Sequence, residues 1–183
     1  MKKLLFILLL ISFSCQTPEP REPVVKRTGR FLKQSAMRNK AIQAEQEKQI
    51  FEIIEKDSAK YHSSPNGFWY KYLERNESDT LKPGFGDIVQ FSYDVSTLDG
   101  KTIYSEDEIG LQEYKMDKED LFSGLRNGLK LMKEGETITF YFPSSVAYDY
   151  YGDENKIGHN IPIRSTVTLH SIKEENKKQL FKP

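Results

Sequence analysis

The chain has 183 residues and a formal net charge of zero at pH 7, and 30% of its residues are charged. This balance leaves no basic footprint of the kind that nucleic-acid-binding domains carry, so the sequence predicts no nucleic-acid partner. After N-terminal processing, a chain of this length is expected to form about one globular domain. Aromatic residues make up 12% of the chain and supply bulky groups for its core.

The first residues are typical of an export signal. Two lysines precede an apolar run from Leu4 to Phe13, which has the length of a signal-peptide core. The run is shorter than the roughly 20 apolar residues that span a bilayer. Residues 1–14 are therefore predicted to be a signal peptide. Cys15, the only cysteine, follows directly, and the junction resembles a bacterial lipobox. We expect lipidation of Cys15 and a bacterial cell-envelope location facing the periplasm; the alternative is a chance cysteine in a cleaved signal.

A tether and a helix are predicted next. Residues 15–34 contain prolines and mixed charges with no apolar period, which indicates a flexible tether. Residues 35–61 are predicted to form a helix, with Ser35 as its N-cap and good helix formers from Ala36 to Lys60. Its apolar face is stronger in the C-terminal half. That face either docks on the protein's own domain or pairs with a partner, including self-association through residues 36–60.

The apolar residues then change to a period of two, which is typical of strands. Residues 62–175 are predicted to form one domain, and residues 176–183 a polar tail. The predicted strands have the following ranges: Gly67 to Glu74, Val89 to Val95, Lys101 to Tyr104, Thr137 to Phe142 and Thr166 to Ile172.

One short amphipathic helix is predicted from Ser123 to Glu134, because its apolar residues recur at spacings of three and four. Gly128 inside this helix costs roughly 1 kcal/mol relative to alanine, so we expect the helix to approach a sheet closely there. Gly135 is predicted to be the C-cap. The economical architecture is α+β, a curved antiparallel sheet of five or six strands wrapped around this helix and preceded by the N-terminal helix.

A tyrosine-rich loop lies between the last two predicted strands. Aromatic side chains with hydroxyls suit a small apolar pocket with a few polar groups. Tyr148 has no obvious core position and is the main candidate for such a pocket, whereas Tyr150 and Tyr151 are assigned to its rim. No metal site is predicted. The acidic residues of the loop are assigned to solvent rather than to a cation site: Asp149, Asp153 and Glu154.

Several motifs in this order resemble those of the FKBP-type peptidyl-prolyl isomerases. They are Gly86 to Tyr93 (GDIVQFSY), Asp99 to Tyr104 (DGKTIY), Leu121 to Glu136, and Phe142 to Tyr148 with Gly152 and Ile161-Pro162 beyond it. The resemblance covers about Pro83 to Ile172 and implies the FKBP-like fold. The layout of signal, tether, helix and domain is similar to that of the lipoproteins associated with gliding motility in the Bacteroidetes.

The resemblance implies a proline-binding pocket. Tyr148 would donate its phenol to a substrate carbonyl, the backbone N–H of Phe122 would be a second donor, and Tyr93 would form a wall. Tyr104 stands where the family usually has an aspartate, and Leu125 stands at the floor, where the family usually has Trp. The resemblance also assigns the following residues to substrate binding: Ile103, Tyr104, Leu121, Leu125, Ile161 and Leu169.

The implied function is peptidyl-prolyl cis-trans isomerisation without a cofactor, acting on proline-containing polypeptides. A membrane-anchored isomerase would assist the folding of exported proteins, with gliding-motility machinery among its clients. The alternative is a non-catalytic chaperone or assembly factor that uses the same pocket. The residues at positions 103, 104 and 125 depart from the family pattern and keep this alternative open.

Overall fold

A computed structural model describes residues 28–175, and the predictions for residues 1–27 and 176–183 lie outside this range. Within this range the chain divides between two units, with the boundary between Arg38 and Asn39. Helix α2 (Thr28–Lys56) begins in the first unit and ends in the second. Within the described range, no helix is both long and apolar enough to cross a membrane.

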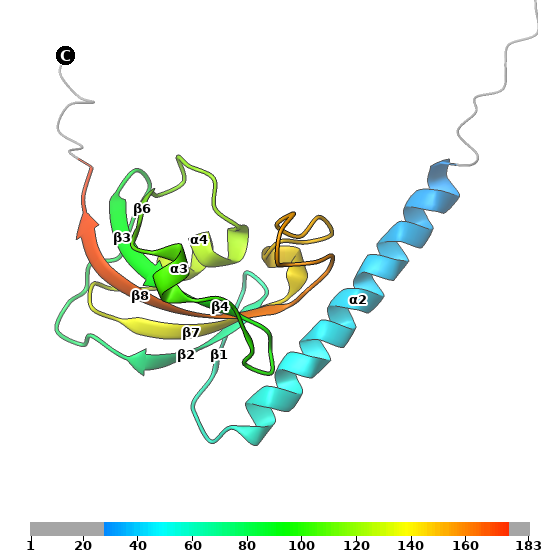
Figure 1. Ribbon diagram of the computed structural model, residues 1–183, viewed down its shortest axis with the longest axis horizontal. Coiled ribbons are helices and arrows are strands. Elements are labelled where there is room, and N and C mark those ends of the chain that lie inside the picture. The colour runs from blue at the N-terminus through cyan, green and yellow to red at the C-terminus, as the bar shows by residue number, and fades with distance from the viewer. Residues whose placement is uncertain (1–27, 176–183) are drawn as a thin grey trace, which may run out of the picture. The chain divides into compact units, whose positions relative to one another are not determined.

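The second unit is built on an antiparallel sheet of eight strands (Figure 1). Its longest path follows the order β1-β2-β7-β8-β3-β6, while β4 pairs with β5 and β8. The strands are β1 (His62–Ser64), β2 (Phe68–Glu74), β3 (Ile88–Tyr93), β4 (Val95–Ser96), β5 (Thr102–Tyr104), β6 (Gln112–Lys115), β7 (Thr137–Phe142) and β8 (Ile163–Lys173).

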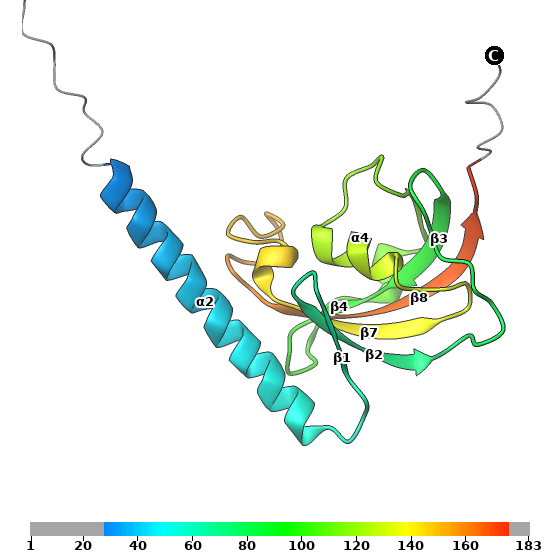
Figure 2. The same ribbon diagram turned by 180° about the vertical axis from the view of Figure 1, so that it is seen from behind.

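Short helical segments connect these strands: α3 (Glu106–Ile109), α4 (Ser123–Leu129) and the 3-10 turn η2 (Ser144–Val146). Helix α4 lies over the concave face of the sheet, which curves around it (Figure 2). Between them is the main core, which includes Leu125 and Leu129 of α4 with Phe140 and Phe142 of β7. The predicted α+β fold class is confirmed, with more strands than the expected five or six.

Alternation along β7 explains why the sheet has two apolar faces. Successive side chains of a strand point to opposite faces. Phe140 and Phe142 therefore enter the main core, whereas Tyr141 between them joins a second cluster with Trp69 of β2 and Ile50 of α2. Of the two roles left open for the helix face, docking on its own domain is the one these contacts show for Ile50.

Two glycines let α4 approach the sheet. A Cβ atom at Gly128 would lie 3.0 Å from the Phe140 ring, and one at Gly124 would lie 2.6 Å from the Phe142 ring and 2.7 Å from the Val146 carbonyl oxygen. The close approach expected at Gly128 is therefore present, and Gly124 adds a second one. Helix α4 packs on the sheet at these two positions because neither residue has a side chain.

The boundaries of both helices differ from the predicted ones. Helix α2 begins at Thr28, before the expected N-cap Ser35, and ends at Lys56. Helix α4 ends at Leu129 instead of Glu134, because the chain leaves the helix through turns in which Leu131 and Met132 donate to residues three positions earlier. Gly135 has a positive φ of 79°, but it lies in the turn before β7 and does not cap α4.

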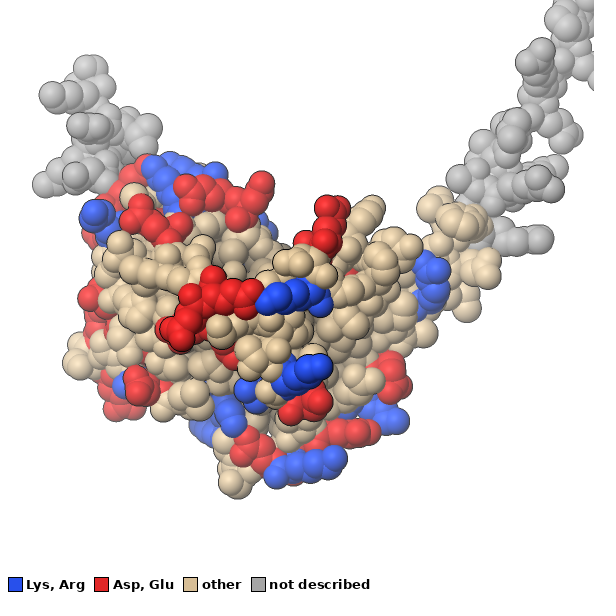
Figure 3. Space-filling view, viewed as in Figure 1, with Lys and Arg blue, Asp and Glu red and all other residues tan. Residues whose placement is uncertain are grey.

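The charged side chains are interspersed rather than sorted by sign. Figure 3 shows acidic and basic side chains next to one another on the face that is in view, with no extended basic block there. Several are paired with one another, including Lys130 with Asp117 at 2.8 Å and Lys71 with Asp57 at 2.5 Å. Both pairs are half-buried and still in contact with solvent, so each adds little to stability compared with the burial of the two apolar clusters.

Replacing Gly124 tests the close packing of α4. Gly124→Ala should lower the free energy of unfolding by about 1–3 kcal/mol, because the added methyl group must displace the Phe142 ring or the backbone at Val146. Urea unfolding of the variant and of Asn127→Ala, a change on the same helix, would measure it. A Gly124→Ala protein as stable as the parent would contradict this account of the packing.

Candidate functional site

Two neighbouring hollows lie between the sheet, α4 and the loop that follows β7. The first has a volume of about 170 Å³ and is lined by Tyr93, Val95, Tyr104, Ile109, Tyr148 and Asp153. The second has a volume of about 390 Å³ and is lined by Tyr93, Asp120, Leu121, Phe122 and Tyr148. Tyr93 and Tyr148 line both hollows, so they belong to one continuous surface. The second volume is within the range of small-ligand pockets.

Aromatic contacts hold the walls of these hollows. The Phe122 ring lies 5.1 Å from the Tyr148 ring and 5.5 Å from the Phe142 ring, measured between centroids. The Tyr93 ring stacks on Phe91 at 5.6 Å. Phe142 and Phe91 are core residues, so the pocket aromatics are fixed from behind by the same core that supports the sheet. Phe122 owes its place to the start of α4, where it is the N-cap residue.

Three donors at the site have no hydrogen-bond partner within residues 28–175. They are the hydroxyls of Tyr93 and Tyr148 and the backbone N–H of Phe122. Burial raises the pKa of the Tyr93 phenol, and burial together with nearby Tyr93, Asp153 and Tyr104 raises the pKa of the Tyr148 phenol. Both phenols therefore stay protonated at neutral pH and can donate to a bound peptide.

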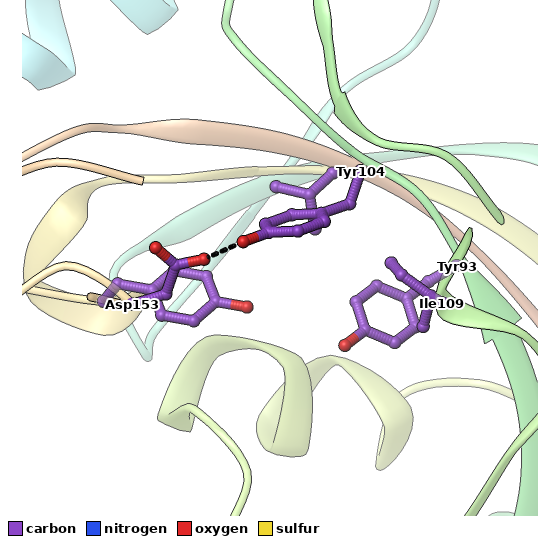
Figure 4. A pocket seen from close by; sticks show the side chains of 6 residues that line it. Tyr93, Tyr104, Ile109 and Asp153 are labelled. Atoms are coloured by element: carbon purple, nitrogen blue, oxygen red, sulfur yellow. Dashed lines mark hydrogen bonds between the residues drawn. The ribbon is translucent and has the colours of Figure 1, made fainter. Parts of the chain in front are cut away.

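The third tyrosine of the first hollow has a different role. The Tyr104 hydroxyl donates to the Asp153 carboxylate, and this hydrogen bond raises the pKa of the Tyr104 phenol (Figure 4). The same hydroxyl accepts the backbone N–H of Lys156 at 3.3 Å. Because its hydrogen-bonding capacity is used within the protein, Tyr104 fastens the loop to β5 and is poorly placed to donate to a ligand.

Asp153 was assigned to a solvated loop, and the structure places it in the wall of the first hollow instead. Its carboxylate accepts the N–H groups of Ile157 at 2.7 Å and Asn155 at 3.0 Å, besides the Tyr104 hydroxyl. Partial burial raises the pKa of this carboxyl, but the hydrogen bonds from Tyr104, Ile157 and Asn155 outweigh burial and hold the pKa below its usual value. An ionised carboxylate is therefore present beside Tyr104, supplied by the loop rather than by β5.

Lys156 completes the attachment of this loop. Its ammonium group forms an ion pair with Glu108 of α3, donates to the Ile103 carbonyl at 3.3 Å and lies 4.5 Å from the centre of the Tyr104 ring. The loop residues around Gly152 are thus joined to β5 and α3. Sequence reasoning missed these contacts, because the sequence of the loop does not reveal the partners of Asp153 and Lys156.

The structure brings most of the predicted site residues together. The hollows are lined by Tyr93, Tyr104, Leu121, Phe122 and Tyr148. Ile103 and Ile161 are half-buried against the core and line neither hollow. Leu125 and Leu169 are 0% exposed, so the structure places them in the core, not in the pocket lining that was expected. Apolar periodicity identifies a residue that faces inward but does not show whether it reaches a surface hollow.

A curved antiparallel sheet wrapped around α4, with an aromatic hollow beside the helix, defines an α+β domain with a surface pocket. A model of the FKBP-type peptidyl-prolyl cis-trans isomerase family matches residues 80–170. The chain belongs to this family.

Similar proteins agree with this assignment. The chain is 31% identical over 117 residues to a probable FKBP-type peptidyl-prolyl cis-trans isomerase FkpA of Neisseria meningitidis, a match that covers 64% of this chain and 41% of that protein. It therefore spans less than half the length of this relative. Two solved structures share the fold. A peptidyl-prolyl cis-trans isomerase of Pseudomonas syringae has a TM-score of 0.60 at 20% identity, over 74% of this chain and 96% of that one. FkpA of Escherichia coli has a TM-score of 0.58 at 22% identity, over 94% and 82%.

Replacing Asp153 tests whether its carboxylate organises the loop. Asp153→Ala should lower the free energy of unfolding by about 1–3 kcal/mol, since two backbone N–H groups and the Tyr104 hydroxyl lose their acceptor. Amide hydrogen exchange at Asn155 and Ile157 should become faster. The neighbouring change Glu154→Ala is the control, and equal effects of the two substitutions would count against an organising role for Asp153.

Proposed function

We propose that this protein is a peptidyl-prolyl cis-trans isomerase that acts on proline-containing polypeptides of the bacterial cell envelope. The observation that carries the proposal is the pair of hollows that share Tyr93 and Tyr148, whose hydroxyls have no partner within the described chain. These hollows lie in the segment that matches the FKBP-type family. A non-catalytic chaperone or assembly factor would use the same surface, and the activity assay below separates the two.

The reaction requires stabilisation of a twisted amide. Amide resonance sets a barrier of about 18–20 kcal/mol to rotation about a peptide bond. A catalyst must therefore bind the twisted amide, whose carbonyl and nitrogen are no longer conjugated, more tightly than either planar isomer. No covalent step, metal or cofactor is required, so binding geometry and electrostatics carry the whole effect.

The aromatic walls provide the seat for the proline ring. Phe122 and Tyr148 are in ring contact at 5.1 Å, and Tyr93 faces both hollows. A ring held among these groups is removed from water, which also strips water from the adjacent carbonyl. Since loss of resonance makes that carbonyl less polar, transfer to an apolar wall costs the twisted form less than the planar one.

The unpaired donors hold the flanking chain. The Tyr148 phenol would donate to a substrate carbonyl next to the proline, and the Phe122 N–H would donate to a second one. The raised pKa of Tyr148 keeps this donor protonated at neutral pH, and its proton would be lost only as the pH rises through that raised value. Asp153 stays ionised at neutral pH because its pKa is lowered, and it provides a carboxylate in the wall next to Tyr104.

Activity and Tyr148 can be tested together. The purified protein should accelerate cis-trans exchange of a proline peptide, measured by NMR exchange spectroscopy. Tyr148→Phe should lower kcat/KM about tenfold, because a hydrogen bond worth about 1.4 kcal/mol in the transition state corresponds to a factor of ten in rate. Tyr151→Phe, a change at a 76% exposed tyrosine of the same loop, is the matched control.

Each arm of this test has a contradicting outcome. A folded protein with no rate above the uncatalysed background would exclude the isomerase and leave the non-catalytic proline-pocket module. An active protein in which Tyr148→Phe behaves like Tyr151→Phe would remove the Tyr148 hydroxyl from the mechanism. Circular dichroism of all three proteins checks that the fold is retained.

The envelope location belongs to the same proposal and rests on residues outside the described range. The apolar run before Cys15 and the position of this sole cysteine support a lipid anchor. Several acyl chains would give stable membrane binding, whereas one chain gives marginal binding. Assistance to gliding-motility machinery is part of the proposal because the predicted order of signal, tether, helix and domain is similar to that of the lipoproteins associated with gliding motility. Self-association through residues 36–60 is supported by exposed apolar side chains such as Met37.

Substitution of Cys15 tests the anchor. Cys15→Ser should release the protein from the membrane fraction into the soluble fraction, because the acceptor thiol of the lipid is lost. Fractionation with immunodetection measures this, and the mass of the native N-terminus identifies the acyl groups. Continued membrane association of the Cys15→Ser protein, or an unmodified N-terminal mass, would refute lipidation.

A further inference from the structure

Gln46 is a buried polar side chain on α2, outside the segment that matches the family. It is 5% exposed, and both ends of its amide group are used. The amide oxygen accepts the backbone N–H of Ser144 at 2.9 Å and the Ser144 hydroxyl at 3.0 Å. The amide nitrogen donates to the Asn160 carbonyl at 2.9 Å. One side chain therefore binds two points of the chain that are 16 positions apart, at residues 144 and 160.

These two points are the ends of the pocket loop, defined here as residues 144–160. Within this loop, the backbone of Asp149 is hydrogen-bonded to both end residues. The Asp149 N–H donates to the Ser144 carbonyl at 2.8 Å, and the Asn160 N–H donates to the Asp149 carbonyl at 2.9 Å. Ser144 and Asn160 thus connect Gln46 on one side to Asp149 on the other.

The backbone needs this support. Asp149 and Asn160 have φ angles of 50° and 55°, in the left-handed region that is uncommon for residues other than glycine. Such conformations persist when the surrounding structure over-determines them. Tyr148 immediately precedes Asp149, so a shift of the Asp149 backbone would also shift the backbone that carries the Tyr148 phenol. Gln46 does not touch the hollows, yet it holds both residues that fix the position of Asp149.

We propose that Gln46 is a positioning residue for the isomerase site. It ties the two ends of the pocket loop together from α2 and thereby aims the Tyr148 hydroxyl at the bound peptide. This inference rests on the proposed function of that site. The alternative is that Gln46 only fastens α2 to the domain, and the experiments below distinguish the two roles.

The first test removes the side chain. Gln46→Ala should make hydrogen exchange at the Asp149 and Asn160 amides faster and should lower kcat/KM for a proline peptide about tenfold, because small displacements of an aligned group carry large rate costs. Exchange within β7 and β8 should stay slow. Gln49→Ala is the matched control, because Gln49 is an exposed glutamine of the same helix whose amide hydrogen-bonds to Glu45, its neighbour one turn earlier.

The second test restores the hydrogen bonds without restoring the residue. In Gln46→Glu a protonated carboxyl can accept from Ser144 and donate to the Asn160 carbonyl, as the amide does, whereas the ionised form has no donor. Burial raises the pKa of a carboxyl. The ratio of variant to parent kcat/KM should therefore increase as the pH falls from about 8 to about 5. If Gln46 only fastened α2 to the domain, the ratio of variant to parent kcat/KM would not depend on pH.

The kcat/KM of the parent protein is measured at each pH, and dividing by it removes the pH effects that both proteins share. The groups hydrogen-bonded to the Gln46 side chain are neutral, namely Ser144 and the Asn160 backbone carbonyl. The ionisable side chains nearest to them along α2 and the loop are Glu45, Glu47, Asp149 and His159. These residues are present in both proteins, so their contribution cancels in the ratio.

The outcomes separate this inference from the proposed function. If Gln46→Ala lowers the melting temperature but leaves kcat/KM and exchange at Asp149 and Asn160 unchanged, Gln46 only fastens the helix and the inference is wrong. If the parent protein has no isomerase activity, the proposed function fails. The exchange measurement then still decides whether Gln46 orders the pocket loop, and faster exchange confined to the loop would support that part alone.

Discussion

The close contact between α4 and the sheet is the constraint on which the other features depend. Gly124 and Gly128 let the helix axis approach Phe140 and Phe142 of β7 to within contact of their rings. A side chain at either position would force the opposing groups or the helix to shift, and a shift of the helix would carry Phe122, its N-cap residue, which lines the second hollow. The distance between α4 and the sheet therefore sets both the packing of the core and the position of Phe122 in the second hollow.

Strand β7 transmits this arrangement to both faces of the sheet. Its alternating side chains place Phe142 under the pocket and Tyr141 in the second cluster with Ile50 and Trp69. The chain then leaves β7 through Pro143 into the pocket loop. Strand β7 therefore has side chains that support the proposed substrate surface on one face and side chains that contact α2 on the other.

Sequence patterns predicted the parts of this fold that repeat. The period of two placed β2 and β7 correctly, and ordered motifs identified the family and five lining residues. The edge strand β6 was missed because it is polar and buries only Tyr114. Partners such as Gln46 and Ser144, 98 positions apart, are joined by side-chain hydrogen bonds that have no periodic signature. The same is true of Asp153, whose place in the hollow depends on the conformation of its loop.

The pairing of β2 with β7 has a consequence for what counts as the domain. Strand β2 (Phe68–Glu74) precedes the family segment, residues 80–170, yet it forms the ladder that covers one side of β7. A polypeptide that started at residue 80 would leave β7 with a free edge, and free edges invite pairing with other chains. The segment that matches the family model is therefore shorter than the sheet of this domain, and a polypeptide that keeps β7 paired must include residues 68–74.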